Sequence, residues 1–142
     1  MPEGTIDLTI VTPERAIVHE QVDELEIPGA EGYLGVLPGH APLFSELKVG
    51  ELGYRKGDRW FFLSVAWGFV EVLPNQVRIL AETAERAQEI DLERAERAKR
   101  RAEERIAKGG EDVDYDRALV ALERALIRIQ VSRKTHITRA SG

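Results

Sequence analysis

Hydrophobic and polar side chains alternate along the first half of the chain. Ile6, Leu8 and Ile10 are separated by polar residues, and the segments 69–72 and 76–79 repeat this alternation. A period of two places successive side chains on opposite faces of a β-strand. Turn-forming Pro, Gly and Asn residues separate these runs at short intervals. Many short strands between turns predict a β-sandwich or a small barrel.

The aromatic residues gather in the same half, because both Trp and all four Phe precede residue 70. A β-fold of about 80 residues has only a thin core, so large side chains matter to it. We expect the aromatic part of the core and its neighbours to be Trp60, Phe61, Phe62, Leu63, Val65, Trp67 and Phe69.

The period changes to a helical one from about Gln88. Small side chains recur at helical spacing at Ala95, Ala98, Ala102 and Ile106. Asp91 is placed to cap this helix, and Gly109-Gly110 are placed to end it. A second helix has its apolar face at Ala118, Leu119, Leu122, Ala125, Leu126 and Ile129. Two helices of about 18 residues joined by a short loop predict an antiparallel hairpin.

The hairpin looks only marginally stable by itself, because one helix offers Ala where the other offers Leu and Ile. Val120, Ile127 and Val131 lie off the main apolar stripe of the second helix and need another surface to cover them. We therefore expect an arm that can dock and undock. The basic segment 132–139 lacks periodicity and is expected to be loose.

Charge divides the chain at the same point as the period. Residues 1–87 carry 7 Lys or Arg against 14 Asp or Glu, whereas residues 88–142 carry 13 against 11. Segments of such different composition usually do different jobs. We predict an α+β protein with two domains, a β-sandwich at 1–87 and an α-helical hairpin with a basic tail at 88–142.

Several classes of function are disfavoured by composition. The chain has no cysteine, which excludes disulfides and thiolate chemistry. No apolar run approaches the roughly 20 residues that span a bilayer, and the first residues do not read as a signal peptide. The three histidines, His19, His40 and His136, have no metal-binding spacing. We therefore expect a non-catalytic protein without a metal site or direct membrane insertion.

The most informative stretch is LGVLPGHAPL, preceded by VTPERAIVHEQVDELEIPGAEG. Together with SVAWGFVEVLPNQVRILAETAERAQEID and RALVALERALIRIQV, it closely resembles the epsilon-subunit family of bacterial and chloroplast F-type ATP synthases. The resemblance covers essentially the whole chain in one order. One departure is Trp67 within Ala66-Trp67-Gly68, where many members have Gly.

The resemblance implies a sandwich of about ten strands at the foot of the central stalk, in contact with the gamma subunit and the membrane c-ring. The family's c-ring contact falls on Glu31, and His40 lies on the same edge and faces gamma. The extended hairpin of the family meets the catalytic beta and alpha subunits and restrains ATP hydrolysis. The implied location is the cytoplasmic face of the bacterial cell membrane, as a peripheral part of the ATP synthase that takes part in proton transport and ATP synthesis.

The resemblance also implies a regulatory ATP site on the folded hairpin. The family motif for this site matches Ile90, Asp91, Arg94 and Ala95. Its remaining contacts match Glu85, Arg101, Arg124 and Arg128. Arg124 and Arg128 are four residues apart on one helix, so both point the same way. Converging guanidinium groups suit a phosphate chain, so ATP is a possible regulatory ligand and no obligatory cofactor is implied.

Two plainer interpretations of these arginines stay open. Glu93–Arg97 and Glu96–Arg100 are spaced four apart, so part of the charge can be a solvated face that pairs with itself. A free-standing ATP-sensing protein is a second alternative, which predicts ATP binding without a gamma partner. A nucleic-acid binder is disfavoured, because the net charge is −5.

Overall fold

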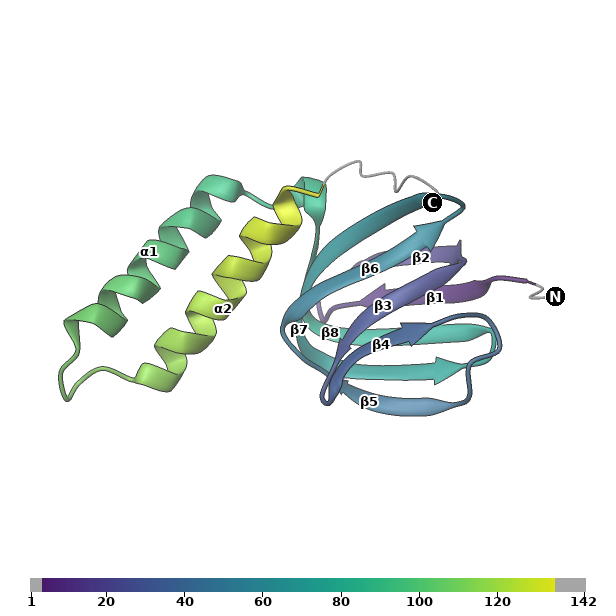
Figure 1. The fold of residues 1–142 in the computed structure, drawn as a ribbon, viewed down its shortest axis with the longest axis horizontal. Coiled ribbons are helices and arrows are strands. Elements are labelled where there is room, and N and C mark those ends of the chain that lie inside the picture. The colour runs from purple at the N-terminus through teal and green to yellow at the C-terminus, as the bar shows by residue number, and fades with distance from the viewer. Residues whose placement is uncertain (1–3, 135–142) are drawn as a thin grey trace.

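A computed structural model describes residues 4–134 of the chain. Within this range, eight strands precede two helices: β1 (Ile6–Val11), β2 (Ala16–Val22), β3 (Glu24–Gly29), β4 (Gly32–Val36), β5 (Leu43–Leu47), β6 (Gly50–Lys56), β7 (Arg59–Leu73) and β8 (Gln76–Arg86). A short 3-10 helix, η1 (Ala87–Glu89), leads to α1 (Leu92–Lys108) and α2 (Tyr115–Ser132). Figure 1 shows the helices beside the sheet, with α2 between α1 and the strands.

The strands form one strongly curved sheet in the order β2-β1-β8-β7-β5-β3-β4, with β6 paired to both β3 and β7. Pairing is antiparallel except between β1 and β8. The long β7 pairs with β6 through residues 59–65 and with β5 through residues 68–72. The sandwich prediction is therefore confirmed, but the described residues hold eight strands instead of about ten, since β7 and β8 each run through both layers.

The core between the layers is aliphatic, with the alternation of β1 as predicted. Ile6, Leu8 and Ile10 are fully buried. Tyr54, which the sequence analysis did not single out, is the largest fully buried side chain. The expected aromatic core is wrong at Phe69, which is 47% exposed. The register explains this, because Val70 and Val72 point inward and leave Phe69 on the outer face.

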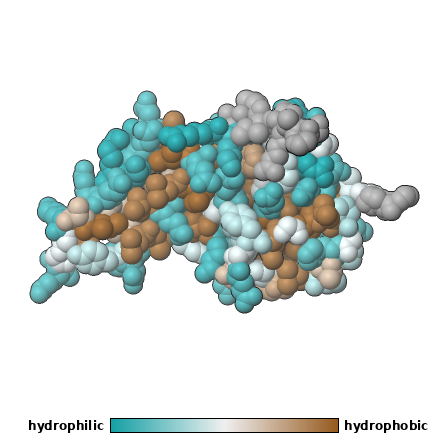
Figure 2. Space-filling view, in the orientation of Figure 1, coloured by the Kyte–Doolittle hydropathy of each residue, from teal (hydrophilic) through white to brown (hydrophobic). Residues whose placement is uncertain are grey.

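The hairpin follows the sequence prediction closely. Asp91 caps α1 by accepting a hydrogen bond from the Arg94 amide, and Gly109 ends the helix with a φ of 64°. Ala95, Ala102, Ala118 and Ala125 are buried between the helices. Leu119 and Leu126, which were predicted on the apolar face of the second helix, are instead 53% and 44% exposed. Figure 2 shows hydrophobic side chains along one face of the hairpin, bordered by hydrophilic ones.

Three smaller predictions concern the charge pairs of α1, the C-terminal tail and membrane insertion. The Glu93–Arg97 pair forms at 3.9 Å, and a Lys99–Glu103 pair takes the place of the expected Glu96–Arg100 pair among the described residues. Ser132 lies in α2, and the rest of the expected loose tail beyond residue 134 lies outside the described range. Neither α1 nor α2 is long and apolar enough to cross a bilayer.

Candidate functional site

The root of the arm, where β8 passes into η1, is fixed by a polar network. The Arg86 guanidinium donates to the Tyr54 hydroxyl at 3.2 Å and to the Ile17 carbonyl at 3.0 Å. The Tyr54 hydroxyl donates in turn to Glu20 at 2.8 Å, and Lys56 donates to the other Glu20 oxygen at 2.7 Å. The network thus ties the end of β8 to β2 and β6 at Arg86, just before η1.

The pKa values within this network follow from its contacts. Burial, together with the hydrogen bond to Glu20, raises the pKa of Tyr54 to about 12. Burial acts to raise the pKa of Glu20, but hydrogen bonds from Lys56 and Tyr54 and the nearby positive charges outweigh it, so this pKa lies below its ordinary value. The network is therefore built for an ionised Glu20 and a neutral Tyr54.

Beyond the root, α2 packs on the sheet through a small apolar cluster. We call this the hinge cluster; it consists of Trp60, Phe62, Ala87, Ile90, Ile127 and Val131. Val131 is fully buried there. The prediction that Ile127 and Val131 need a second surface is confirmed, whereas Val120 stays 36% exposed.

Polar contacts surround the hinge cluster. Glu85 on β8 receives two hydrogen bonds from the Arg128 guanidinium, at 2.7 and 3.2 Å. Glu51 on β6 accepts from Gln130 at 2.9 Å and from Lys134 at 2.7 Å. These contacts join α2 to two different strands. The docked arm is thus held by a few specific contacts and by one small apolar cluster.

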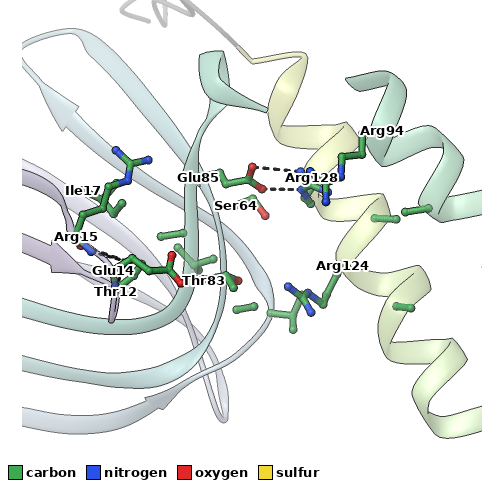
Figure 3. A pocket seen from close by; sticks show the side chains of 17 residues that line it. Thr12, Glu14, Arg15, Ile17, Ser64, Thr83, Glu85, Arg94, Arg124 and Arg128 are labelled. Carbon is green, nitrogen blue, oxygen red and sulfur yellow. Dashed lines mark hydrogen bonds and ion pairs between the residues drawn. The ribbon is translucent and has the colours of Figure 1, made fainter. Parts of the chain in front are cut away.

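A cavity of about 480 Å³ opens between the sheet and the arm. We call it the arm cavity. Its polar lining comes from both sides: Thr12, Glu14, Arg15, Ser64, Thr83 and Glu85 from the sheet, and Arg94, Arg124 and Arg128 from the arm. Figure 3 shows the last three projecting from the helices toward the sheet residues. The volume lies within the roughly 300–1,000 Å³ that is usual for small-molecule sites.

The arginine side chains of the arm cavity differ in their binding partners. Arg128 is committed to Glu85, while the Arg15 guanidinium contacts Glu89 at 3.4 Å. The Arg124 guanidinium has no carboxylate partner among the described residues and lies over the Trp67 ring, 5.4 Å from its centre. Arg94 lines the cavity with its side chain, and its backbone amide is bound by Asp91. The cavity therefore offers positive charge to an anion from α1 and from α2.

Of the eight residues predicted for an ATP site, the structure brings four to the arm cavity, namely Glu85, Arg94, Arg124 and Arg128. Asp91 caps α1, Ile90 belongs to the hinge cluster, and Ala95 is fully buried. Arg101 is exposed on α1, outside the cavity lining. The sequence alone did not predict four further lining residues, Thr12, Arg15, Ser64 and Thr83, because only the folding of the sheet brings these strand and turn residues to the arm.

The residues predicted to face the c-ring and gamma lie at the two ends of the edge strand β4. Glu31 is exposed in the turn before it. His40 is half-buried in the loop after it, with Nδ1 2.6 Å from the Ala41 carbonyl oxygen. Glu31 precedes β4 and His40 follows it in the chain, so the two residues lie beyond opposite ends of this strand. Within residues 4–134, no group of His, Asp and Glu side chains is arranged to hold a metal ion.

Comparison with known families matches residues 5–87 to the ATP synthase delta/epsilon chain beta-sandwich domain and residues 88–133 to the long alpha-helix domain of the same chain. The ATP synthase epsilon chain of Geobacter metallireducens is 52% identical over 132 residues, which cover 92% of this chain and 95% of the relative. That of Desulforamulus reducens is 47% identical over 125 residues, covering 88% and 95%.

Solved structures agree with this family. A chain of the Euglena gracilis mitochondrial ATP synthase superposes with a TM-score of 0.74 at 28% identity, covering 84% of this chain and 76% of that chain. A chain in the central stalk and c-ring structure of the Tetrahymena thermophila enzyme shares the fold, with a TM-score of 0.55 at 16% identity. This chain therefore belongs to the delta/epsilon family of ATP synthase subunits, and it is a non-catalytic subunit.

Proposed function

We propose that the chain is a central-stalk subunit of a proton-translocating ATP synthase at the cytoplasmic face of a bacterial cell membrane, and that its arm restrains ATP hydrolysis under the control of bound ATP. The observation that carries this proposal is the arm cavity, whose walls come from the sheet on one side and from both helices on the other. A ligand there contacts three elements that separate when the arm extends.

The chemistry of the arm cavity favours a polyanionic nucleotide. Arg94 and Arg124 supply forked donors for phosphate oxygens, and Glu85 already holds the Arg128 guanidinium in place. A ligand that binds only the docked arm stabilises it by about 2.7 kcal/mol at a hundred times its dissociation constant. Abundant ATP would then keep the arm docked, and falling ATP would release it to the catalytic beta and alpha subunits.

Calorimetric titration of the full chain with ATP tests this site. Arg124→Ala and Arg128→Ala should each weaken binding, whereas Arg117→Ala, an exposed arginine at the start of α2, should not. ATP should also raise the thermal midpoint of the chain. Absence of binding heat and an unchanged midpoint at millimolar ATP would remove the nucleotide from the proposal.

The place of the chain in the stalk is supported by the outer face of the sheet. Phe44 and Phe69 are 67% and 47% exposed and stack with their ring centres 5.6 Å apart, beside the 57% exposed Leu80. Exposed aromatic side chains on a sheet are typical of protein interfaces, and we assign this face to gamma. Phe44→Ser should weaken copurification with gamma without changing the thermal midpoint of the free chain. If the wild-type chain binds ATP but does not bind gamma, the chain is instead a free-standing ATP sensor.

The contact with the c-ring is assigned to the exposed turn that carries Glu31, with His40 at the other end of β4 on the gamma side. Replacing both residues should lower the number of protons pumped per ATP hydrolysed while the chain stays folded, since neither side chain belongs to the core. Unchanged coupling in the double variant would remove both residues from the interface.

A further inference from the structure

Trp67 has an unusual backbone conformation at the point where β7 bends. Its φ is 52°, and it is the only residue other than Gly with a positive φ in the described part of the chain. Side chains with a Cβ disfavour this region, which Gly adopts freely. A costly conformation of this kind persists where the surroundings require it and is a reason to ask what the side chain does.

The Trp67 ring faces the arm. The Arg124 guanidinium carbon lies 5.4 Å from the ring centre, within the distance of about 6 Å for a cation–π contact. Both side chains are half-buried, and Arg124 lines the arm cavity. This contact is also the one nearest the hairpin tip among those described between α2 and the sheet, seven residues before Val131 of the hinge cluster.

A ring and a carboxylate hold an arginine in different ways. Glu85 occupies Nε and Nη2 of Arg128, so two donors of that guanidinium are used inside the protein. A ring that holds a guanidinium by a cation–π contact occupies none of its N–H groups in a hydrogen bond to an acceptor atom. Arg124 is therefore held in position while its donors stay available to an anion in the arm cavity.

We propose that Trp67 is a positioning residue, a platform that holds Arg124 over the bend of β7, helps to dock α2 and presents the Arg124 donors to a polyphosphate in the arm cavity. The second part rests on the proposed nucleotide site, whereas the docking part stands on the contact alone. Neither part assigns Trp67 a direct contact with the ligand.

A conservative series separates the platform from a merely structural role. Trp67→Gly removes the ring and suits the positive φ, so the thermal midpoint of the full chain should not fall. Trp67→Phe keeps a ring and should rescue the contact. The chain has no native cysteine, so Ala87→Cys places one thiol in the hinge cluster, where its labelling rate measures how often the arm opens.

On this background we expect Trp67→Gly to label about fivefold faster than wild type and Trp67→Phe within about twofold of it. Binding of ATP, and of inorganic tripolyphosphate as a probe without the nucleoside, should weaken about fivefold in the Gly variant only. Equal labelling of all three proteins, or a Phe variant that labels like the Gly variant, would overturn the platform.

A fall in the thermal midpoint of Trp67→Gly with no change in labelling would make the residue structural and also overturn the proposal. If wild type binds neither ATP nor tripolyphosphate, the nucleotide site and the presentation of Arg124 both fail. The docking role is then decided by the labelling rates alone.

Discussion

The docked state of the arm depends more on the hinge cluster than on its ion pairs, and Val131→Ala tests this. Val131 is fully buried between α2 and the sheet, and the substitution removes two carbon atoms from that contact. At about 0.8 kcal/mol per buried methylene, docking loses about 1.6 kcal/mol, which is about a fifteenfold rise in the open population. Alanine favours helix, so α2 itself stays intact.

The Glu85–Arg128 pair provides the comparison. Its side chains are 35% and 21% exposed, so solvent screens the pair and its contribution is at most about 1 kcal/mol, or about fivefold in the open population. Glu85→Gln should therefore open the arm less than Val131→Ala. This order holds even though the pair has two hydrogen bonds, at 2.7 and 3.2 Å, because burial and screening decide the magnitudes.

The measurement is the labelling rate of the Ala87→Cys thiol in each variant without ATP. Val120→Ala is the matched control, since it makes the same substitution in the same helix at a residue that is 36% exposed and outside the hinge cluster. Its rate should stay within about twofold of wild type. A Glu85→Gln rate above that of Val131→Ala, or equal rates for both valine variants, would refute the reasoning.

Three further predictions concern the sheet. Gly68→Ala should lower the free energy of unfolding by about 3 kcal/mol or more, because the φ of Gly68 is 134° and a Cβ would lie 1.8 Å from the Leu80 carbonyl oxygen. Gly35→Ala is the control, since a Cβ there meets nothing within 4 Å, and it should change the free energy of unfolding by less than about 0.5 kcal/mol. Denaturant titrations measure both values. The raised pKa of Tyr54 stabilises the fold below pH 10, so about 2–3 kcal/mol should be lost as pH rises from 10 toward 12, and Tyr54→Phe should flatten this part of the stability–pH curve. Deleting residues 88–142 should leave a folded sheet that still binds gamma, and it should accelerate ATP hydrolysis by the assembled enzyme. Circular dichroism measures whether the fragment folds. A fragment that fails to fold would show that the sheet and the arm are one cooperative unit.

The elements of the arm could be predicted from sequence because their signals are local. A helix start is decided by a side chain that reaches its own backbone three residues on, as Asp91 does, and a helix end by a residue that tolerates positive φ, as Gly109 does. The number of strands could not be predicted from local signals. β7 continues through the bend at Trp67 and Gly68, so each of its halves serves a different layer within one strand. No residue-level pattern separates one bent strand from two straight ones.

The residues of the candidate site also differ in whether local sequence signals predict them. Arg124 and Arg128 lie one turn apart on α2, and Arg94 belongs to a family motif at the start of α1, so helical spacing and the motif predict these residues. Their partners come from far away in the chain: Glu85 is 43 residues from Arg128, and Trp67 is 57 residues from Arg124. The family resemblance predicted Glu85 as a site residue, but with 25 acidic residues available charge alone does not select it as the partner of Arg128. The closure of the sheet brings Glu85 to Arg128 and Trp67 to Arg124.

The two surfaces that α2 buries differ in chemistry, and this difference bears on the proposed opening of the arm. Within the hairpin the buried side chains include the small residues Ala95, Ala102, Ala118 and Ala125, each of which gains little from leaving water. Toward the sheet α2 buries Val131 and part of Ile127 in the hinge cluster. The contact between the helices is therefore extended but weak per residue, while the contact with the sheet is small but concentrated. Under the proposed function, extension of the arm would break both contacts, and a ligand in the arm cavity would touch all three elements at once. Such a ligand would oppose both steps with a single binding event, which neither interface achieves alone.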